Sequence, residues 1–90
     1  MSPAILQSLM AKTRDEIKLA HENVEFYFSM KKKYDEESDL VEEYHCHNII
    51  TAIKNHIKKL VIQQKALKAS YFEELAIAKM DDWEHGNVYE

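Results

Sequence analysis

The sequence predicts an all-α protein, an antiparallel hairpin of two long helices with a short C-terminal tail. The only proline is Pro3 and the only glycine is Gly86. The chain between them therefore lacks the two residues that most strongly break helices. Apolar residues recur there at alternating spacings of three and four, as on one face of a helix. This periodicity loses phase once, near Tyr34, which favours two helices over one long rod.

The first helix is predicted over about residues 3–33. Ser2 followed by Pro3 is typical of a capping residue and the first helical position. A seam of residues spaced as in a heptad repeat follows, interrupted by Lys31, and a second apolar stripe runs beside it. The seam consists of Leu6, Met10, Thr13, Ile17, Ala20, Val24, Tyr27 and Tyr34, and the stripe of Ile5, Leu9, Leu19, Phe26 and Met30.

A turn is predicted near Tyr34–Ser38. Extending the first seam by heptads places position a at His45, whereas the second seam has position a at Ile50. A slip of five residues is neither of the insertions, of three or four residues, that a continuous coiled coil absorbs. Asp39-x-x-Glu42 has the pattern of a capping box that opens a new helix. The lack of a glycine at the end of the first helix argues against the turn.

The second helix is predicted over about residues 39–79. Its seam begins at Cys46 and alternates by four and three without a slip. β-Branched residues at position a, leucine at position d and one polar residue at position a are typical of parallel dimeric coiled coils, although an antiparallel bundle shows much the same pattern. The polar residue, Gln64, either fixes the register or turns outward. We expect the seam to form an oligomer contact through Ile50, Ile53, Ile57, Leu60, Gln64, Leu67 and Tyr71.

One hairpin leaves apolar surface uncovered, since Ile49, Val61 and Leu75 exceed a two-residue seam. Two hairpins that pair into a four-helix bundle would cover it, so we expect a homodimer, parallel or antiparallel. Residues 1–80 then form one hairpin domain, and residues 81–90 an acidic, aromatic tail. No apolar run approaches the roughly 20 residues of a membrane span.

The charge is zoned along the chain. The net formal charge is −4, yet no acidic residue lies between Cys46 and Phe72. The lysines of this stretch form a stripe that would suit contacts with phosphates. The chain holds one arginine, Arg14, the residue type that best specifies bases. A dimeric nucleic-acid-binding regulator is therefore the alternative function, with Lys54, Lys58, Lys65 and Lys68 as candidate contacts.

Catalytic and metal-binding chemistry find little support in the sequence. His45, Cys46 and His47 are adjacent on a helix and point about 100° apart, so they cannot face one ion together. Cys46 lacks the glycine-rich loops that usually build an oxyanion site. We expect no enzyme, no cofactor and no metal site. A single cysteine also fits a reducing, cytoplasmic setting.

The leading functional hypothesis is a non-enzymatic protein-binding module, such as an adaptor, chaperone or inhibitor. An excess of apolar helical surface and zoned charge favour recognition by surface contact. Large aromatic residues are typical interface anchors. The candidate partner-binding residues are Phe26 and Phe28 near the end of the first helix and Trp83 and Tyr89 in the tail.

Overall fold

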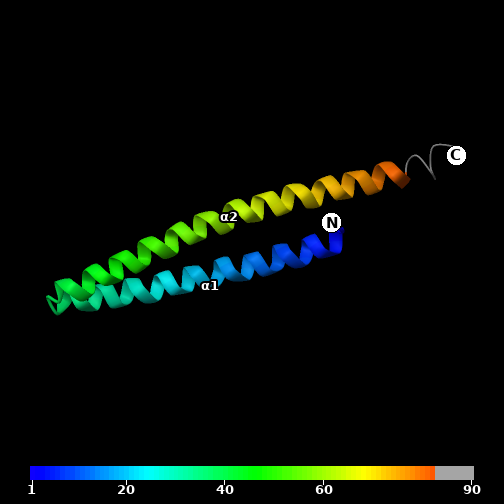
Figure 1. Cartoon of the computed structure of the whole chain (residues 1–90). Coiled ribbons are helices and arrows are strands. Elements are labelled where there is room, and N and C mark those ends of the chain that lie inside the picture. Colours follow the sequence, from blue (N-terminus) through cyan, green and yellow to red (C-terminus); the bar gives the residue numbers. More distant parts are fainter. Residues whose placement is uncertain (83–90) are drawn as a thin grey trace.

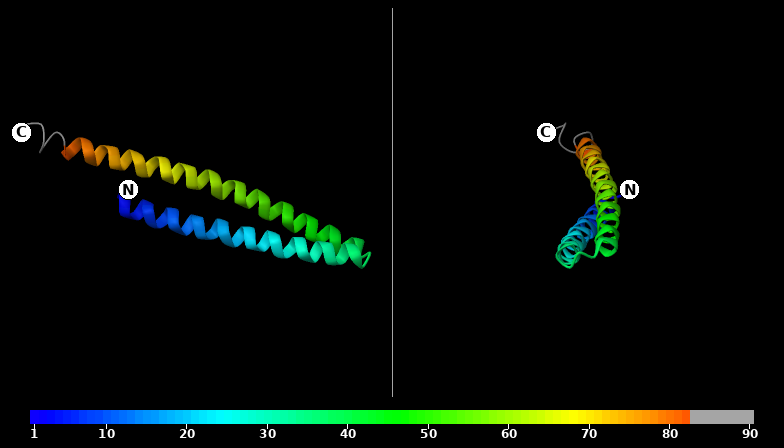
Figure 2. Two further views of the ribbon diagram at one scale, coloured as in Figure 1. Left: turned by 180° about the vertical axis from the view of Figure 1, so that it is seen from behind. Right: turned by 90° about the vertical axis from the view of Figure 1, so that its left-hand side faces the viewer.

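The protein is an all-α helical hairpin, as predicted. The computed structural model describes residues 1–82, which form α1 (Pro3–Glu36) and α2 (Leu40–Asp82). The two helices pack against each other in antiparallel orientation (Figure 1). They are slightly inclined to each other when viewed from the end (Figure 2).

The N-terminus of α1 is capped as the sequence predicts. Ser2 has an extended backbone, and its Oγ accepts a hydrogen bond of 3.3 Å from the amide of Ile5. Pro3 occupies the first turn, where an amide hydrogen has no partner within the helix. The helix continues to Glu36, three residues beyond the predicted end.

The turn contains a C-terminal motif that usually depends on glycine. The amide of Asp39 donates to the carbonyl of Tyr34 at 2.9 Å, and the amide of Ser38 donates to the carbonyl of Asp35 at 3.1 Å. These two bonds define a Schellman motif, whose central residue takes a left-handed backbone conformation. Ser38 takes that position with φ of 58°. The hairpin therefore closes without glycine because a serine accepts the left-handed conformation.

The start of α2 shows one half of the predicted capping box. Asp39 Oδ1 accepts a hydrogen bond of 3.3 Å from the amide of Glu42. The amide of Asp39 is already bonded to Tyr34, so the reciprocal bond from the Glu42 side chain is replaced by the Schellman bond. The helix then continues to Asp82, past the predicted end at residue 79.

The core is a single seam between the two helices. All of its buried residues belong to the two predicted heptad seams. Thr13, only 3% exposed, satisfies its hydroxyl by donating to the carbonyl of Leu9 at 2.9 Å. The buried residues are Leu6, Thr13, Ala20 and Val24 of α1 and Cys46, Ile50 and Leu60 of α2.

α2 is longer than α1 and extends beyond its N-terminus. The Gln7 side chain donates to the Tyr71 hydroxyl at 2.8 Å, and the N-terminal amine lies 3.9 Å from a carboxylate oxygen of Glu74. These contacts place the start of the chain level with Glu74. Residues 75–82, which we call the overhang, therefore continue for about 12 Å at 1.5 Å per residue without α1 beside them (Figure 1).

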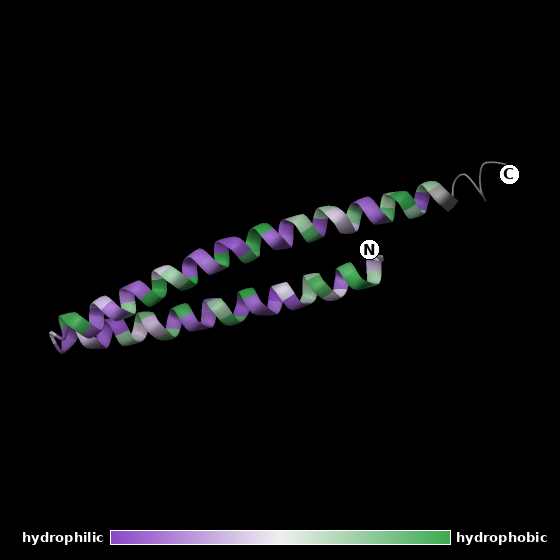
Figure 3. Cartoon of the chain, in the orientation of Figure 1, coloured by the Kyte–Doolittle hydropathy of each residue, from purple (hydrophilic) through white to green (hydrophobic). Residues whose placement is uncertain are grey.

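The hairpin is only one helix thick. Its Cα atoms extend 16 and 14 Å across the long axis. Apolar residues occur along both helices, including the overhang of α2 (Figure 3). Within residues 1–82, neither helix has a stretch apolar enough to cross a membrane. A two-helix layer of this kind buries one seam and leaves both of its flanks exposed to solvent.

Candidate functional site

The two exposed flanks of the seam differ in chemistry. In an antiparallel pair of helices, heptad positions g and c of one helix adjoin the same positions of the other. Positions e and b form the opposite flank. Exposed apolar residues lie on both flanks, but most of the cations gather on the second flank, and the first carries fewer charged residues. We call them the apolar face and the basic face.

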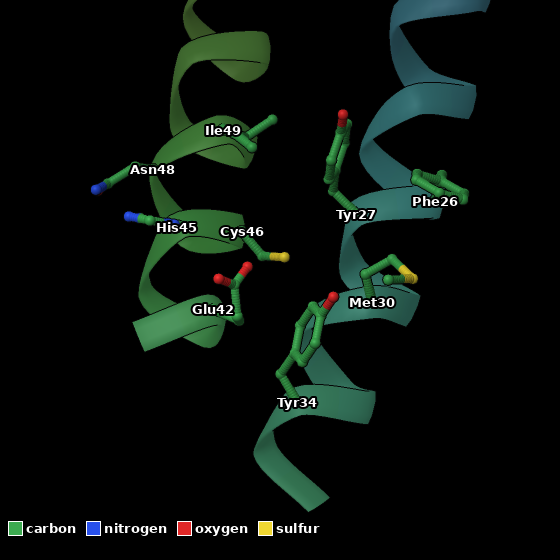
Figure 4. Close-up of a pocket in the computed structure, with 9 residues that line it drawn as sticks. All are labelled: Phe26, Tyr27, Met30, Tyr34, Glu42, His45, Cys46, Asn48 and Ile49. Carbon is green, nitrogen blue, oxygen red and sulfur yellow. The ribbon is translucent and has the colours of Figure 1, made fainter. Parts of the chain in front are cut away.

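The apolar face is hollowed next to the turn. A groove of about 390 Å³ lies between the end of α1 and the start of α2, and we call it the turn groove (Figure 4). Mostly apolar and aromatic side chains surround it, which is typical of docking surfaces. Its lining residues are Phe26, Tyr27, Met30, Tyr34, Glu42, His45, Cys46, Asn48 and Ile49.

The turn groove has a buried floor and exposed edges. Cys46, only 5% exposed, points from α2 toward α1 beside the rings of Tyr27 and Tyr34 (Figure 4). Phe26 lies at the α1 edge, is 58% exposed and meets the Tyr27 ring edge to face, with centroids 5.2 Å apart. Ile49 is exposed at the other edge. The aromatic pair holds Phe26 at the surface in a fixed orientation.

The groove also perturbs one titratable group. Partial burial, and then the nearby carboxylate of Glu42, raise the pKa of the Tyr34 phenol. Both effects act in the same direction, because each disfavours the phenolate. The Tyr34 phenol therefore keeps its proton to a higher pH than an ordinary tyrosine, which has a pKa of 10.

Beyond the groove, the apolar face continues to the far end of the molecule. It contains Leu19 in the middle of α1, Ile5 near the N-terminus and Ile77 on the overhang, each about half-exposed. Charged residues interrupt it, since Lys12 and Glu16 of α1 and Lys59 and Glu73 of α2 lie on the same flank. The apolar residues of this face are Ile5, Leu9, Leu19, Phe26 and Met30 of α1 and Ile49, Ala52, Ala66, Ile77 and Met80 of α2.

The basic face combines residues from both helices. The four predicted lysines of α2 are exposed on it, and the heptad register places two cations of α1 beside them. No acidic residue lies on this flank between residues 7 and 21 of α1 or between residues 51 and 72 of α2. None of its cations forms an ion pair within the described residues. The basic face comprises Arg14, Lys18, Lys54, Lys58, Lys65 and Lys68.

The two predicted phenylalanines lie on opposite faces. Phe26 borders the turn groove, whereas Phe28 lies under the ammonium of Lys54, which is 5.1 Å from the ring centroid. That distance is within the range of a cation–π interaction. Phe28 therefore belongs with the basic face and cannot contribute to the same contact as Phe26.

The seam residues predicted for an oligomer contact face α1 of the same chain. Ile50 and Leu60 are buried, and Ile53, Ile57, Gln64, Leu67 and Tyr71 are half-buried. Gln64 points into the seam, and its Oε1 atom is buried with no hydrogen-bond partner among the described residues. A second, smaller hollow beside Gln64 is lined by Gln7, Met10, Ala11, Arg14 and Tyr71.

The histidines that flank Cys46 point to different places. His45 points away from the seam and Cys46 points into it (Figure 4). His47 lies near Leu40 and Tyr44 on the other flank. Within residues 1–82, no three histidine, cysteine or acidic side chains gather as metal ligands.

The structure groups residues that single-helix patterns do not connect. Tyr27, Met30 and Ile49 form the turn groove, and Arg14 and Lys18 extend the lysine stripe. Matching the heptad flanks of both helices across the predicted hairpin would have found both groups.

The tail candidates Trp83 and Tyr89 lie outside the described residues. Comparison with protein-family models, curated proteins and solved structures finds no match.

Proposed function

We propose that this chain is a non-enzymatic protein-binding module that acts through its apolar face, and that it pairs with a second copy into a four-helix bundle. The turn groove is the observation that carries the proposal. It combines a concave surface of about 390 Å³ with an aromatic side chain, Phe26, that is 58% exposed. Exposed aromatic residues around a preformed groove are typical of the residues that dominate binding energy.

The size of the apolar face supports pairing. α1 is about 51 Å long at 1.5 Å per residue, and the hairpin is 16 Å wide between Cα atoms. The face alongside α1 therefore offers about 800 Å² per copy, which is the contribution of one partner to a stable interface of standard size. The seam is already occupied within the hairpin, so a partner must use a face outside it, and the apolar face is the one that contains the turn groove.

A photo-cross-linking experiment tests the proposal. p-Benzoylphenylalanine replaces Phe26 in one variant and Phe28 in the other, and both are irradiated in cells of the native host. The two sites are the same residue type, two positions apart and on opposite faces, with exposed fractions of 58% and 46%. We expect a discrete adduct from position 26 and none from position 28. An adduct of twice the chain mass joins two copies of this chain, and an adduct of any other mass joins the chain to a different protein that takes the place of the second copy on the apolar face. Equal labelling, or no adduct at position 26, would contradict the proposal.

The dimer is tested separately. Sedimentation equilibrium should give twice the monomer mass of 10.6 kDa. Phe26→Glu combined with Met30→Glu should shift the equilibrium to monomer, because both charges would enter the interface. Circular dichroism should show unchanged helix content, since neither residue belongs to the buried seam. A monomeric wild-type chain would refute the dimer.

The basic face supports a second candidate, binding of nucleic acid. Six cations lie on one flank with no acidic residue among them over residues 7–21 and 51–72. Contacts from all six to a duplex predict a log–log salt slope of about −5. Gel shifts across a salt series measure this slope. Lys58→Glu with Lys65→Glu should abolish binding, whereas Lys12→Glu on the opposite flank should change it little. No binding at low salt would remove this candidate.

The compartment follows from cysteine use. Cys46 is a free thiol buried in the seam. A free buried cysteine is typical of proteins that work in a reducing compartment, and it supports our proposal that the chain works in the cytoplasm.

A further inference from the structure

We propose that two copies pair in antiparallel orientation, with the overhang of each lying in the turn groove of the other. This inference rests on the proposed dimer and specifies its geometry. The overhang, residues 75–82, has no α1 beside it. Ile77 and Met80 are 50% and 62% exposed on it and share the apolar face with Ile49. The overhang is a convex apolar end, and the turn groove is a concave one.

The spacing along α2 matches this arrangement. Ile49 and Ile77 are 28 residues apart, or about 42 Å at 1.5 Å per residue. The two apolar faces meet if a two-fold axis lies between them, perpendicular to the helices and level with Gln63. This axis brings Ile77 of one copy over Ile49 of the second copy. A two-fold axis repeats each contact, so both grooves are filled at once.

The same axis produces matching pairs on α1. Gln63 lies level with Arg14, as judged from the Gln7–Tyr71 contact and the turn at Ser38. Residues equally far from Arg14 in opposite directions then face each other. Leu9 lies level with Leu19 of the second copy, and Lys12 lies level with Glu16 of the second copy. The only central charges of α1 on this face are therefore paired with opposite charges.

The shorter length of α1 leaves room for the overhang. In this register, residue 3 of the second copy lies level with residue 25, just before Phe26. α1 of the second copy thus ends where the turn groove begins. The overhang can settle between α1 and α2 at this level. The groove is completed by residues that the partner copy supplies.

A parallel dimer would bury less apolar surface. Its two overhangs would both lie beyond the ends of the two α1 helices, with no helix opposite them. The antiparallel form covers an additional length of about 12 Å of a single helix, which is about 10 Å across. That amounts to about 120 Å² per copy, a small addition to a standard single-partner contribution of about 800 Å². The antiparallel orientation therefore covers more exposed apolar surface than the parallel one.

Distances between spin labels decide the orientation. Ile49→Cys and Ile77→Cys are each made in a Cys46→Ala background, labelled with a nitroxide and measured by double electron–electron resonance. Each single variant should show labels about 42 Å apart across the antiparallel dimer. A mixture of the two variants should add a distance below about 20 Å. Circular dichroism confirms that the background folds.

A parallel dimer would give the opposite pattern, with short distances in each single variant and a long one in the mixture. That result would overturn the orientation and leave the dimer standing. A monomeric wild-type chain by sedimentation would overturn the dimer itself. Any adduct at Phe26 would then have to join the chain to a different protein, because no second copy would lie on the turn groove.

Matched glutamate variants give a second readout. Ile77→Glu should raise the dimer dissociation constant by about tenfold or more, because it places a charge in the turn groove of the other copy. Ile62→Glu changes an isoleucine of the same helix that is 67% exposed on the outer side. It should leave the constant within about twofold. Equal effects of both variants would refute a role for the overhang.

Discussion

Replacing Ser38 with glycine should stabilise the hairpin by about 0.5–1 kcal/mol. Ser38 has φ of 58°, a conformation in which its Cβ crowds the neighbouring carbonyl. This crowding costs about 1–2 kcal/mol for an L-residue, and glycine avoids it. Glycine also gains more freedom in the unfolded chain, which returns part of the benefit. The hydrogen bonds of the turn come from backbone atoms, so the substitution leaves them in place.

Urea denaturation followed by circular dichroism measures the effect, at several protein concentrations so that dimerisation is accounted for. The matching thermal shift is about 2–8 °C for a chain of this size. Glu37→Gly is the control, since Glu37 has φ of −83° and ψ of −2° in the right-handed region. Glycine there relieves no crowding and should cost about 0.5–1 kcal/mol.

The two variants should therefore change stability in opposite directions although they are adjacent. Destabilisation by Ser38→Gly would show that the left-handed residue lies elsewhere in the turn. Equal losses from both variants would indicate that only chain entropy matters, and the proposed Schellman motif would be wrong.

Three further predictions concern the seam and the turn groove. Gln64→Leu should raise the free energy of unfolding, measured by urea denaturation, by about 1–2 kcal/mol, because it removes a buried oxygen that has no hydrogen-bond partner among the described residues. A lower free energy of unfolding would mean that this oxygen is hydrogen-bonded. Leu60→Asp should lower the free energy of unfolding by about 3 kcal/mol or more, whereas Ile62→Asp should lower it by less than about 1 kcal/mol, since the exposed fractions of the two side chains are 4% and 67%. Similar losses from both variants would show that Leu60 does not belong to the buried seam. The contribution of Tyr34 to the free energy of unfolding should be fully present below the ordinary tyrosine pKa of 10 and should be lost as pH rises through the raised pKa of Tyr34. Tyr34→Phe should reduce this loss in thermal unfolding at alkaline pH. An unchanged dependence of stability on pH in this variant would refute the raised pKa.

Much of the fold was predictable because it depends on local rules. Ser2, Pro3 and Asp39 act on atoms within one helical turn, so their roles follow from short patterns. The slip in heptad phase located the reversal of the chain within a few residues. The helix ends were less accurate. α1 continues to Glu36 because Ser38 takes the left-handed position that composition alone assigns to glycine.

The candidate site was only partly predictable because it spans both helices. Phe26 and Phe28 lie close together in sequence, and only the packing of α1 on α2 shows that they face opposite ways. Likewise, the lysine stripe can be seen in the sequence of α2, but Arg14 joins it only through the register of the hairpin. The seam of α2 resembled a dimer contact because a heptad pattern does not say which helix covers it.

This ambiguity bears directly on function. If the seam of α2 formed the dimer, its partner would have to displace α1 and expose Leu6 and Val24, both of which are buried. That exchange would bury no more apolar surface than the hairpin already does. A dimer through the apolar face instead adds burial to an intact hairpin and leaves the basic face exposed on both outer sides. The same assembly could then present cations to a second ligand, so protein pairing and polyanion binding are compatible in one molecule. A variant that disrupts the apolar face should accordingly weaken both activities, whereas charge reversal at Lys58 and Lys65 should weaken only the second.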